Sequence, residues 1–129
     1  MNILLDTCAF LWIIKGDTTH LSKKTLDSLL DPENSVFLSV ISIWEIMVKN
    51  GLGKLPLPTP VYPYLLHQRE IHKISSLSVE ERDLEFLPKL GEFHRDPFDR
   101  ILICQSLARQ MKIATNDQHI MKYPVSVLQ

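Results

Sequence analysis

Short apolar runs alternate with longer segments of helical periodicity along this chain, and this alternation restricts the fold more than any other feature of the sequence. The runs at 2–6 and 36–39 have the length of buried strands, and each is followed by a segment with apolar residues at helical spacing. Strands that alternate with helices are typical of α/β domains. The sequence therefore predicts an α/β fold with a mainly parallel central sheet.

The predicted strands occupy 2–6, 36–39, 72–74, 113–115 and 125–128, of which the third is the weakest and the last is an edge strand. The predicted helices occupy 8–15, a segment after the N-cap Ser22, 42–52, a segment through Leu65 to Arg69, a segment opened by the capping-box pair Ser78 and Glu81, and 98–110. The proline-rich stretch between them is a loop, so we expect residues 1–129 to form a single domain.

Composition excludes several classes of protein. No apolar run has the length needed to cross a bilayer, and the first residues lack the basic leader of a signal peptide, so we expect a cytoplasmic protein without membrane contact. Cys8 and Cys104 lie in apolar contexts and are expected to be buried, free thiols. The net charge of −1 does not indicate a nucleic-acid binder, so any such contact would need local basic patches or a metal ion.

Acidic residues stand beside the apolar runs. They are Asp6, Glu45, Asp96, Asp99 and Asp117. A carboxylate is costly to bury without a partner. Sites in open parallel sheets form beyond the carboxyl ends of the strands, which places Asp6 and Asp117 at the same edge. Several carboxylates gathered at one edge predict a bound cation.

The ligand types favour a hard divalent cation. Mg²⁺ prefers carboxylate and water oxygens, Mn²⁺ also suits such a site, and the cysteine and histidine spacing does not support zinc. Structural alternatives remain open. Asp96 before Pro97 fits a helix N-cap as well as a ligand, Asp99 fits a first-turn acid, and Asp117 fits a turn residue.

Ordered motifs resemble those of one protein family. They are Leu4-Leu5-Asp6-Thr7, Ser42-Ile43-Trp44-Glu45-Ile46, Gly53-Lys54-Leu55, His94-Arg95-Asp96-Pro97-Phe98-Asp99-Arg100 and Thr115-Asn116-Asp117. Together they resemble a PIN-domain protein of the VapC-type toxin branch of bacterial toxin–antitoxin systems, over essentially the whole chain. One departure is the stretch 109–112, where relatives often have a glycine turn.

The resemblance implies a three-layer α/β/α fold and a metal-dependent endoribonuclease, which hydrolyses RNA phosphodiester bonds with water activated at Mg²⁺. It implies a homodimer that a cognate antitoxin inhibits. The metal-binding and catalytic acids of the family fall on Asp6, Glu45, Asp99 and Asp117. Asp96, Thr7 and Thr115 correspond to accessory positions, and the candidates for RNA contact are Arg95, Arg100, Lys49 and Lys54.

Some of these residues have other interpretations. A haloacid-type phosphatase needs a second acid two residues after the first, and Cys8 occupies that place. Lys49 and Lys54 fit a solvated helix face as well as a phosphate-binding patch, and Arg95 and Arg100 fit ion pairs with Asp96 or Glu92 as well as RNA contacts. The principal rival function is a catalytically silent PIN-like module that binds RNA or protein.

Overall fold

Five strands form one parallel sheet in the computed structural model, which describes residues 1–91 and 96–128. The strands are β1 (Asn2–Leu5), β2 (Ser35–Ser39), β3 (Ser75–Leu77), β4 (Lys112–Ala114) and β5 (Val127–Leu128). Their order is β3-β2-β1-β4-β5, and every neighbouring pair is parallel. The predicted parallel sheet is confirmed, with β5 at one edge.

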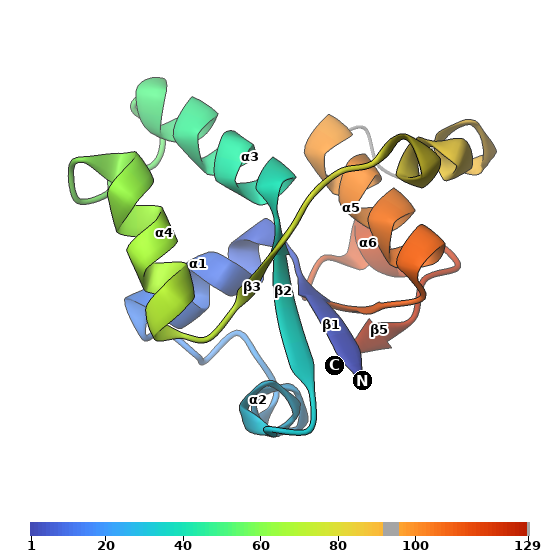
Figure 1. Cartoon of the computed structure of the whole chain (residues 1–129), viewed down its shortest axis with the longest axis horizontal. Coiled ribbons are helices and arrows are strands. Elements are labelled where there is room, and N and C mark those ends of the chain that lie inside the picture. Colours follow the sequence, from blue (N-terminus) through green and yellow to red (C-terminus); the bar gives the residue numbers. More distant parts are fainter. Residues whose placement is uncertain (92–95, 129) are drawn as a thin grey trace.

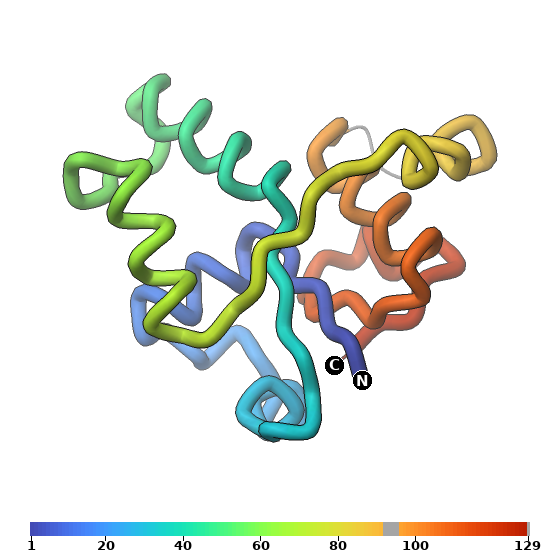
Figure 2. Tube along the Cα trace, in the orientation of Figure 1, coloured from blue at the N-terminus to red at the C-terminus, as the bar shows by residue number. Residues whose placement is uncertain are grey.

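Helices cover both faces of the sheet (Figure 1). They are α1 (Thr7–Lys15), α2 (Lys23–Leu30), α3 (Val40–Gly51), α4 (Val61–Ile71), the 3₁₀ helix η1 (Glu81–Lys89), α5 (Pro97–Arg109) and α6 (Gln118–Met121). Figure 1 shows α1, α3 and α4 on one side of the strands and η1, α5 and α6 on the other. In Figure 2 the chain leaves α4 and crosses along β3 to η1. The three-layer α/β/α architecture is therefore confirmed.

The alternation of side chains along β1 divides the core in two. Ile3 and Leu5 pack with Phe10 of α1 and Ile46 of α3 on one face. Leu4 points to the opposite face and packs with residues of α5 and β4. All three β1 side chains are fully buried, because both faces of a parallel sheet are covered.

Polar residues directly before several helices start those helices. Asp6, Ser22, Ser39, Asp96 and Asp117 each occupy an N-cap, and each side chain accepts a hydrogen bond from an amide of the first turn. The cap at Ser39 makes α3 begin directly after β2 and not at residue 42. Helix starts are thereby fixed at the carboxyl ends of β1 and β2.

Two local predictions of secondary structure are wrong, and one short helix was not predicted. The third strand lies at 75–77 and not at 72–74, because α4 continues to Ile71 and Lys73 then turns the chain with a φ of 57°. The helix near Glu81 begins after the N-cap Glu80, whose amide donates to the Asp83 carboxylate at 2.8 Å, and not after Ser78. The short α6 was not predicted, because its four residues carry no periodic pattern.

The thiols differ from each other in exposure. Cys104 is buried as predicted, but Cys8, in the first turn of α1, is exposed. Both are free, and no helix within residues 1–91 and 96–128 has the length and apolar character of a membrane span.

We expect the fold to depend on an ion pair between η1 and α5. Asp83 is fully buried and accepts from Arg109 Nε at 3.0 Å and Nη2 at 3.1 Å. Replacing Arg109 by Met leaves a buried carboxylate without its cation and should cost about 3 kcal/mol of unfolding free energy, measured by urea denaturation.

Arg82→Met is the matched control. Arg82 pairs with Glu80 at the surface, where both side chains are more than half exposed, and its loss should cost less than about 1 kcal/mol. Equal effects of the two substitutions would contradict the structural importance of the Asp83–Arg109 pair.

Candidate functional site

Asp6 and Thr115 meet because β1 and β4 are parallel neighbours. Leu5 pairs with Ala114, and the Asp6 amide extends the ladder by donating to the Ala114 carbonyl at 3.1 Å. The Thr115 hydroxyl then donates to Asp6 Oδ2 at 2.5 Å, while Asp6 Oδ1 accepts from the Ala9 amide at 2.7 Å. Asp6 is only 4% exposed, so these two bonds orient a buried carboxylate.

The charge on Asp6 is disfavoured by its surroundings. Desolvation by burial is the largest cause and raises the pKa of Asp6 to about 6, although the hydrogen bonds from Thr115 and Ala9 oppose it. The negative charges of Asp117 and Glu45 raise this pKa further. Asp117 and Glu45 are therefore near enough for their charges to act on Asp6.

Glu45 is held by two elements. Its carboxylate is buried on α3, where Oε1 accepts from the Thr7 hydroxyl at 2.7 Å and Oε2 from Lys49 Nζ at 2.5 Å. The Thr7 oxygen also lies 2.9 Å from the hydroxyl of Ser42, one helical turn before Glu45. Thr7 follows Asp6 directly, so α1 and α3 are joined beside the first acid.

The start of α5 supplies Asp96 and Asp99. Asp96 Oδ1 accepts from the amides of Phe98 at 2.8 Å and Asp99 at 3.2 Å, so the N-cap interpretation of Asp96 is confirmed. The Phe98 ring meets Trp44 of α3 edge to face with centroids 5.1 Å apart. This contact holds the first turn of α5 against the helix that carries Glu45.

The pKa of Cys8 is affected by Asp99 and by other acids. Desolvation by burial raises the pKa of its thiol to about 11, and the charges of Asp6, Asp99 and Glu45 raise it as well. The charges of acids from three parts of the chain, the end of β1, α3 and the start of α5, thus act on one thiol. Asp99, at the start of α5, is therefore near enough to Cys8 for its charge to act on the thiol.

Asp117 enters from the loop after β4. Its amide donates to Thr115 Oγ1 at 3.0 Å, and its Oδ1 accepts from the His119 amide at 2.7 Å as the cap of α6. Thr115 therefore contacts both Asp6 and Asp117, which explains how an accessory hydroxyl can position two acids.

The four basic candidates occupy different settings. Lys49 pairs with Glu45, and the hydrogen bond to Glu45 is the largest cause of its raised pKa. Arg100 donates to the Gly91 carbonyl at 3.1 Å and to the Tyr123 hydroxyl at 3.3 Å. Lys54 is exposed in the turn after α3. Arg95 lies outside the described residues, as does His94 of the same motif.

Sequence reasoning missed two residues at this site. Ser42 is buried beside Thr7, and its position three residues before Glu45 on one helix face could have identified it. Cys8 was assigned to the core, because its apolar neighbours in sequence do not reveal that the α1 N-terminus opens toward the acids.

The donor chemistry fits a hard divalent cation. The carboxylates after β1, on α3, at the start of α5 and in the β4–α6 loop bring only oxygen donors. The charges of Asp117 and Glu45 also disfavour the charge on Asp6, a repulsion that a bound cation would relieve. Within residues 1–91 and 96–128, no group of three or more His, Cys, Asp or Glu side chains is already arranged to hold a metal ion. Binding would therefore require side-chain adjustment.

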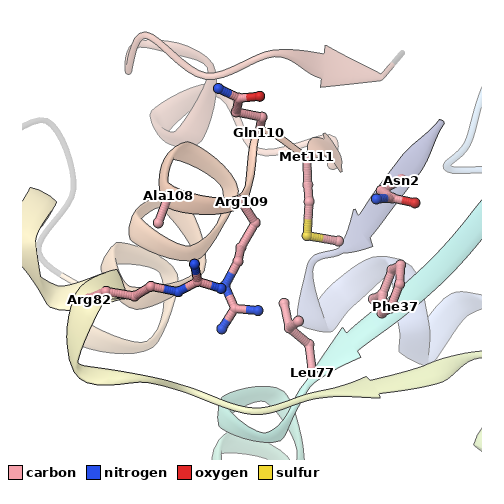
Figure 3. A pocket seen from close by; sticks show the side chains of 8 residues that line it. All are labelled: Asn2, Phe37, Leu77, Arg82, Ala108, Arg109, Gln110 and Met111. Carbon is pink, nitrogen blue, oxygen red and sulfur yellow. The ribbon is translucent and has the colours of Figure 1, made fainter.

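A cavity of about 370 Å³ lies elsewhere (Figure 3). Its lining includes Asn2, at the amino end of β1, and Gln110 and Met111, which precede β4. Arg109 lines it as well but is committed to Asp83. The cavity is therefore separate from the acid cluster at the carboxyl ends of these strands.

We expect the metal-free protein to lose stability as Asp6 ionises. The pKa of Asp6 is raised above its ordinary value near 4, so the unfolded chain releases this proton first and stability falls between about pH 4 and pH 6. The loss is on the order of 3 kcal/mol. Urea denaturation of metal-depleted wild type and Asp6→Asn gives the free energy of unfolding of each at several pH values, and the loss is the difference between the two pH profiles. Parallel profiles would contradict the prediction.

Comparisons with known proteins agree with this architecture. The family model described as PIN domain matches residues 3–125. Ribonuclease VapC16 of Mycobacterium tuberculosis is 27% identical, and the alignment covers 99% of this chain and all of that protein.

Among solved structures, VapBC2 from Rickettsia felis, bound to a DNA fragment from its promoter, superposes with a TM-score of 0.72 at 15% identity, covering 100% of this chain and 98% of that one. VapBC-1 from nontypeable Haemophilus influenzae gives 0.64 at 18% identity, covering 95% and 94%. FitAcB from Neisseria gonorrhoeae gives 0.59 at 20% identity, covering 98% and 96%. With its family model matched from β1 to the residues before β5, this chain belongs to the PIN-domain family.

Proposed function

We propose that this protein is a divalent-metal-dependent endoribonuclease and the toxin of a toxin–antitoxin pair. The observation that carries the proposal is the cluster at the carboxyl ends of β1 and β4, where Asp6 is buried with a raised pKa among the charges of Asp117 and Glu45. Perturbed carboxylates gathered in this way are typical of catalytic sites. Similarity to Ribonuclease VapC16 along the whole chain supports the same function.

The proposed roles of the acids are those that the resemblance to the family implies. Asp6, Asp99 and Asp117 would hold Mg²⁺, or Mn²⁺, directly or through water, and Glu45 would position a second cation or the attacking water. A bound cation supplies Lewis acidity at the scissile phosphate and lowers the pKa of a water molecule. Thr115 orients Asp6 through a 2.5 Å hydrogen bond, and Thr7 orients Glu45 through one of 2.7 Å.

RNA and an antitoxin are the proposed partners in the cytoplasm. The small net charge of −1 makes local contacts necessary for RNA, and Arg95, Arg100, Lys49 and Lys54 are the candidates. The structural relatives VapBC2 and VapBC-1 support a cognate antitoxin. A binding module without catalysis is the alternative, and RNA cleavage that requires Mg²⁺ and stops in EDTA separates the two.

A homodimer is proposed as well. Trp44, Met47, Val48 and Leu52 repeat at helical spacing along α3, and each is 37% exposed or more. Such a stripe on a monomer surface is typical of an interaction site. It lies next to the face that carries Glu45, so a second copy there would border the acid cluster.

Removal of the primary acids should abolish cleavage. Substitution of outer-sphere partners of metals already lowers activity about 10–100-fold, so Asp6→Asn and Asp99→Asn should each lower RNA cleavage by at least about 100-fold. The assay is cleavage of a labelled RNA mixture in Mg²⁺, with circular dichroism to check folding.

Two further variants calibrate that result. Asp27→Asn, an exposed acid on α2, should retain wild-type activity. Asp96→Asn should lose less activity than Asp99→Asn and some thermal stability, because Asp96 caps α5. Full activity of both Asp6→Asn and Asp99→Asn would disprove the assigned site.

Expression of the chain alone should arrest bacterial growth, and co-expression of a small neighbouring gene should relieve the arrest. Asp6→Asn supplies the control, because it should leave growth unaffected. Growth arrest by Asp6→Asn equal to that by wild type would indicate toxicity without catalysis.

A charge placed on the α3 stripe should weaken the dimer. Leu52 is 65% exposed, and Leu52→Glu would bury a carboxylate in the proposed interface. Light scattering after gel filtration should show a shift toward monomer. Leu30→Glu on α2, at a residue 81% exposed, should leave the mass unchanged, and a shift with that variant only would place the interface elsewhere.

A further inference from the structure

Lys49 reaches from the surface to a buried carboxylate. Its side chain is 44% exposed, whereas that of Glu45 is 4% exposed, and the two atoms Nζ and Oε2 lie 2.5 Å apart one helical turn from each other. The other oxygen of Glu45 accepts from Thr7. Without the ammonium, Glu45 would be a buried anion with a neutral partner alone, which is strongly unfavourable.

Lys49 is also the cation that sits within the field of the acid cluster. Asp96 and Cys8 both act on its ammonium, and Asp6 is repelled by the same Glu45 that Lys49 neutralises. The second well-buried ion pair described above, between Asp83 and Arg109, lies between η1 and α5 and has a structural role. Lys49 therefore places a positive charge where the proposed function needs a divalent cation.

We propose that Lys49 is a built-in counter-cation that competes with the divalent metal ion for Glu45. This inference rests on the proposed function, since it concerns the same acids. In the metal-free protein the ammonium neutralises Glu45 and keeps its carboxylate in place. A cation that engages Glu45 must displace the ammonium, and the long, partly exposed side chain of Lys49 allows it to move toward solvent.

Competition makes a prediction with a definite sign. A lysine that only lies at the surface would have little effect on the affinity of the protein for the metal ion. A residue that orients a metal ligand would increase that affinity. A competing cation lowers metal affinity, because two positive charges at one carboxylate repel each other. Neutralising Lys49 should therefore tighten metal binding while destabilising the metal-free protein.

The experiment measures Mn²⁺ binding by the loss of the free-ion signal in electron paramagnetic resonance. Lys49→Met should bind Mn²⁺ about tenfold more tightly than wild type, and Lys49→Arg, which keeps the charge, should bind within about twofold of wild type. Lys49→Gln tests the same loss of charge with a polar side chain in case the Met variant folds poorly. Lys24→Met, at an exposed lysine on α2, is the control and should not change the affinity.

A second readout needs no metal. In EDTA, the melting temperatures of wild type, Lys49→Met, Glu45→Gln and the double variant form a double-mutant cycle. Lys49→Met should melt at a lower temperature than the double variant, because the double variant has neither charge of the pair. Additive effects would overturn the counter-cation role. Equal or weaker Mn²⁺ binding by both charge-removing variants would overturn the competition while leaving the proposed function intact. Absence of Mn²⁺ binding by every variant, wild type included, would overturn the metal site and the competition together.

Discussion

The parallel pairing of β1 with β4 is the constraint on which the rest of this structure depends. It joins residues more than a hundred positions apart in sequence and brings Thr115 within 2.5 Å of Asp6. Both strands end at the same edge, so the residues that follow them, Asp6 with Thr7 and Thr115 with Asp117, form one cluster. A β4 that was antiparallel to β1 would present its amino end there and separate Asp6 from Thr115 and Asp117.

Charge at this edge is balanced by specific partners. Burial and neighbouring acids raise the pKa of Asp6 to about 6, so ionisation of this side chain lowers the stability of the folded protein. The Thr115 hydroxyl and the Ala9 amide offset part of that loss by donating hydrogen bonds to Asp6. Glu45 is bound by the Thr7 hydroxyl and neutralised by Lys49. A divalent cation bound here would relieve the repulsion that Asp117 and Glu45 exert on Asp6.

Much of the arrangement could be predicted from sequence because it depends on local rules. Apolar runs followed by Asp6 and Ser39 encode strand ends and helix caps together, and parallel topology then places the strand-end residues at one edge. The position of β3 could not be predicted, since its serines have weak strand propensity and the strand is set by pairing with β2. The Lys49–Glu45 pair has helical spacing, but only tertiary burial of Glu45 distinguishes it from an exposed surface pair.

Crystals of the protein soaked in Mn²⁺ offer the most direct test of the central claim, that these acids form a divalent-metal site. Anomalous difference density should show an ion within about 2.5 Å of carboxylate oxygens of Asp6 and of Asp99 or Asp117, at the carboxyl ends of β1 and β4. The same soak of Asp6→Asn crystals should show a weaker peak or none. Density for Mn²⁺ only at other surface carboxylates, with Asp6 still bonded to Thr115 and Ala9 alone, would contradict the account.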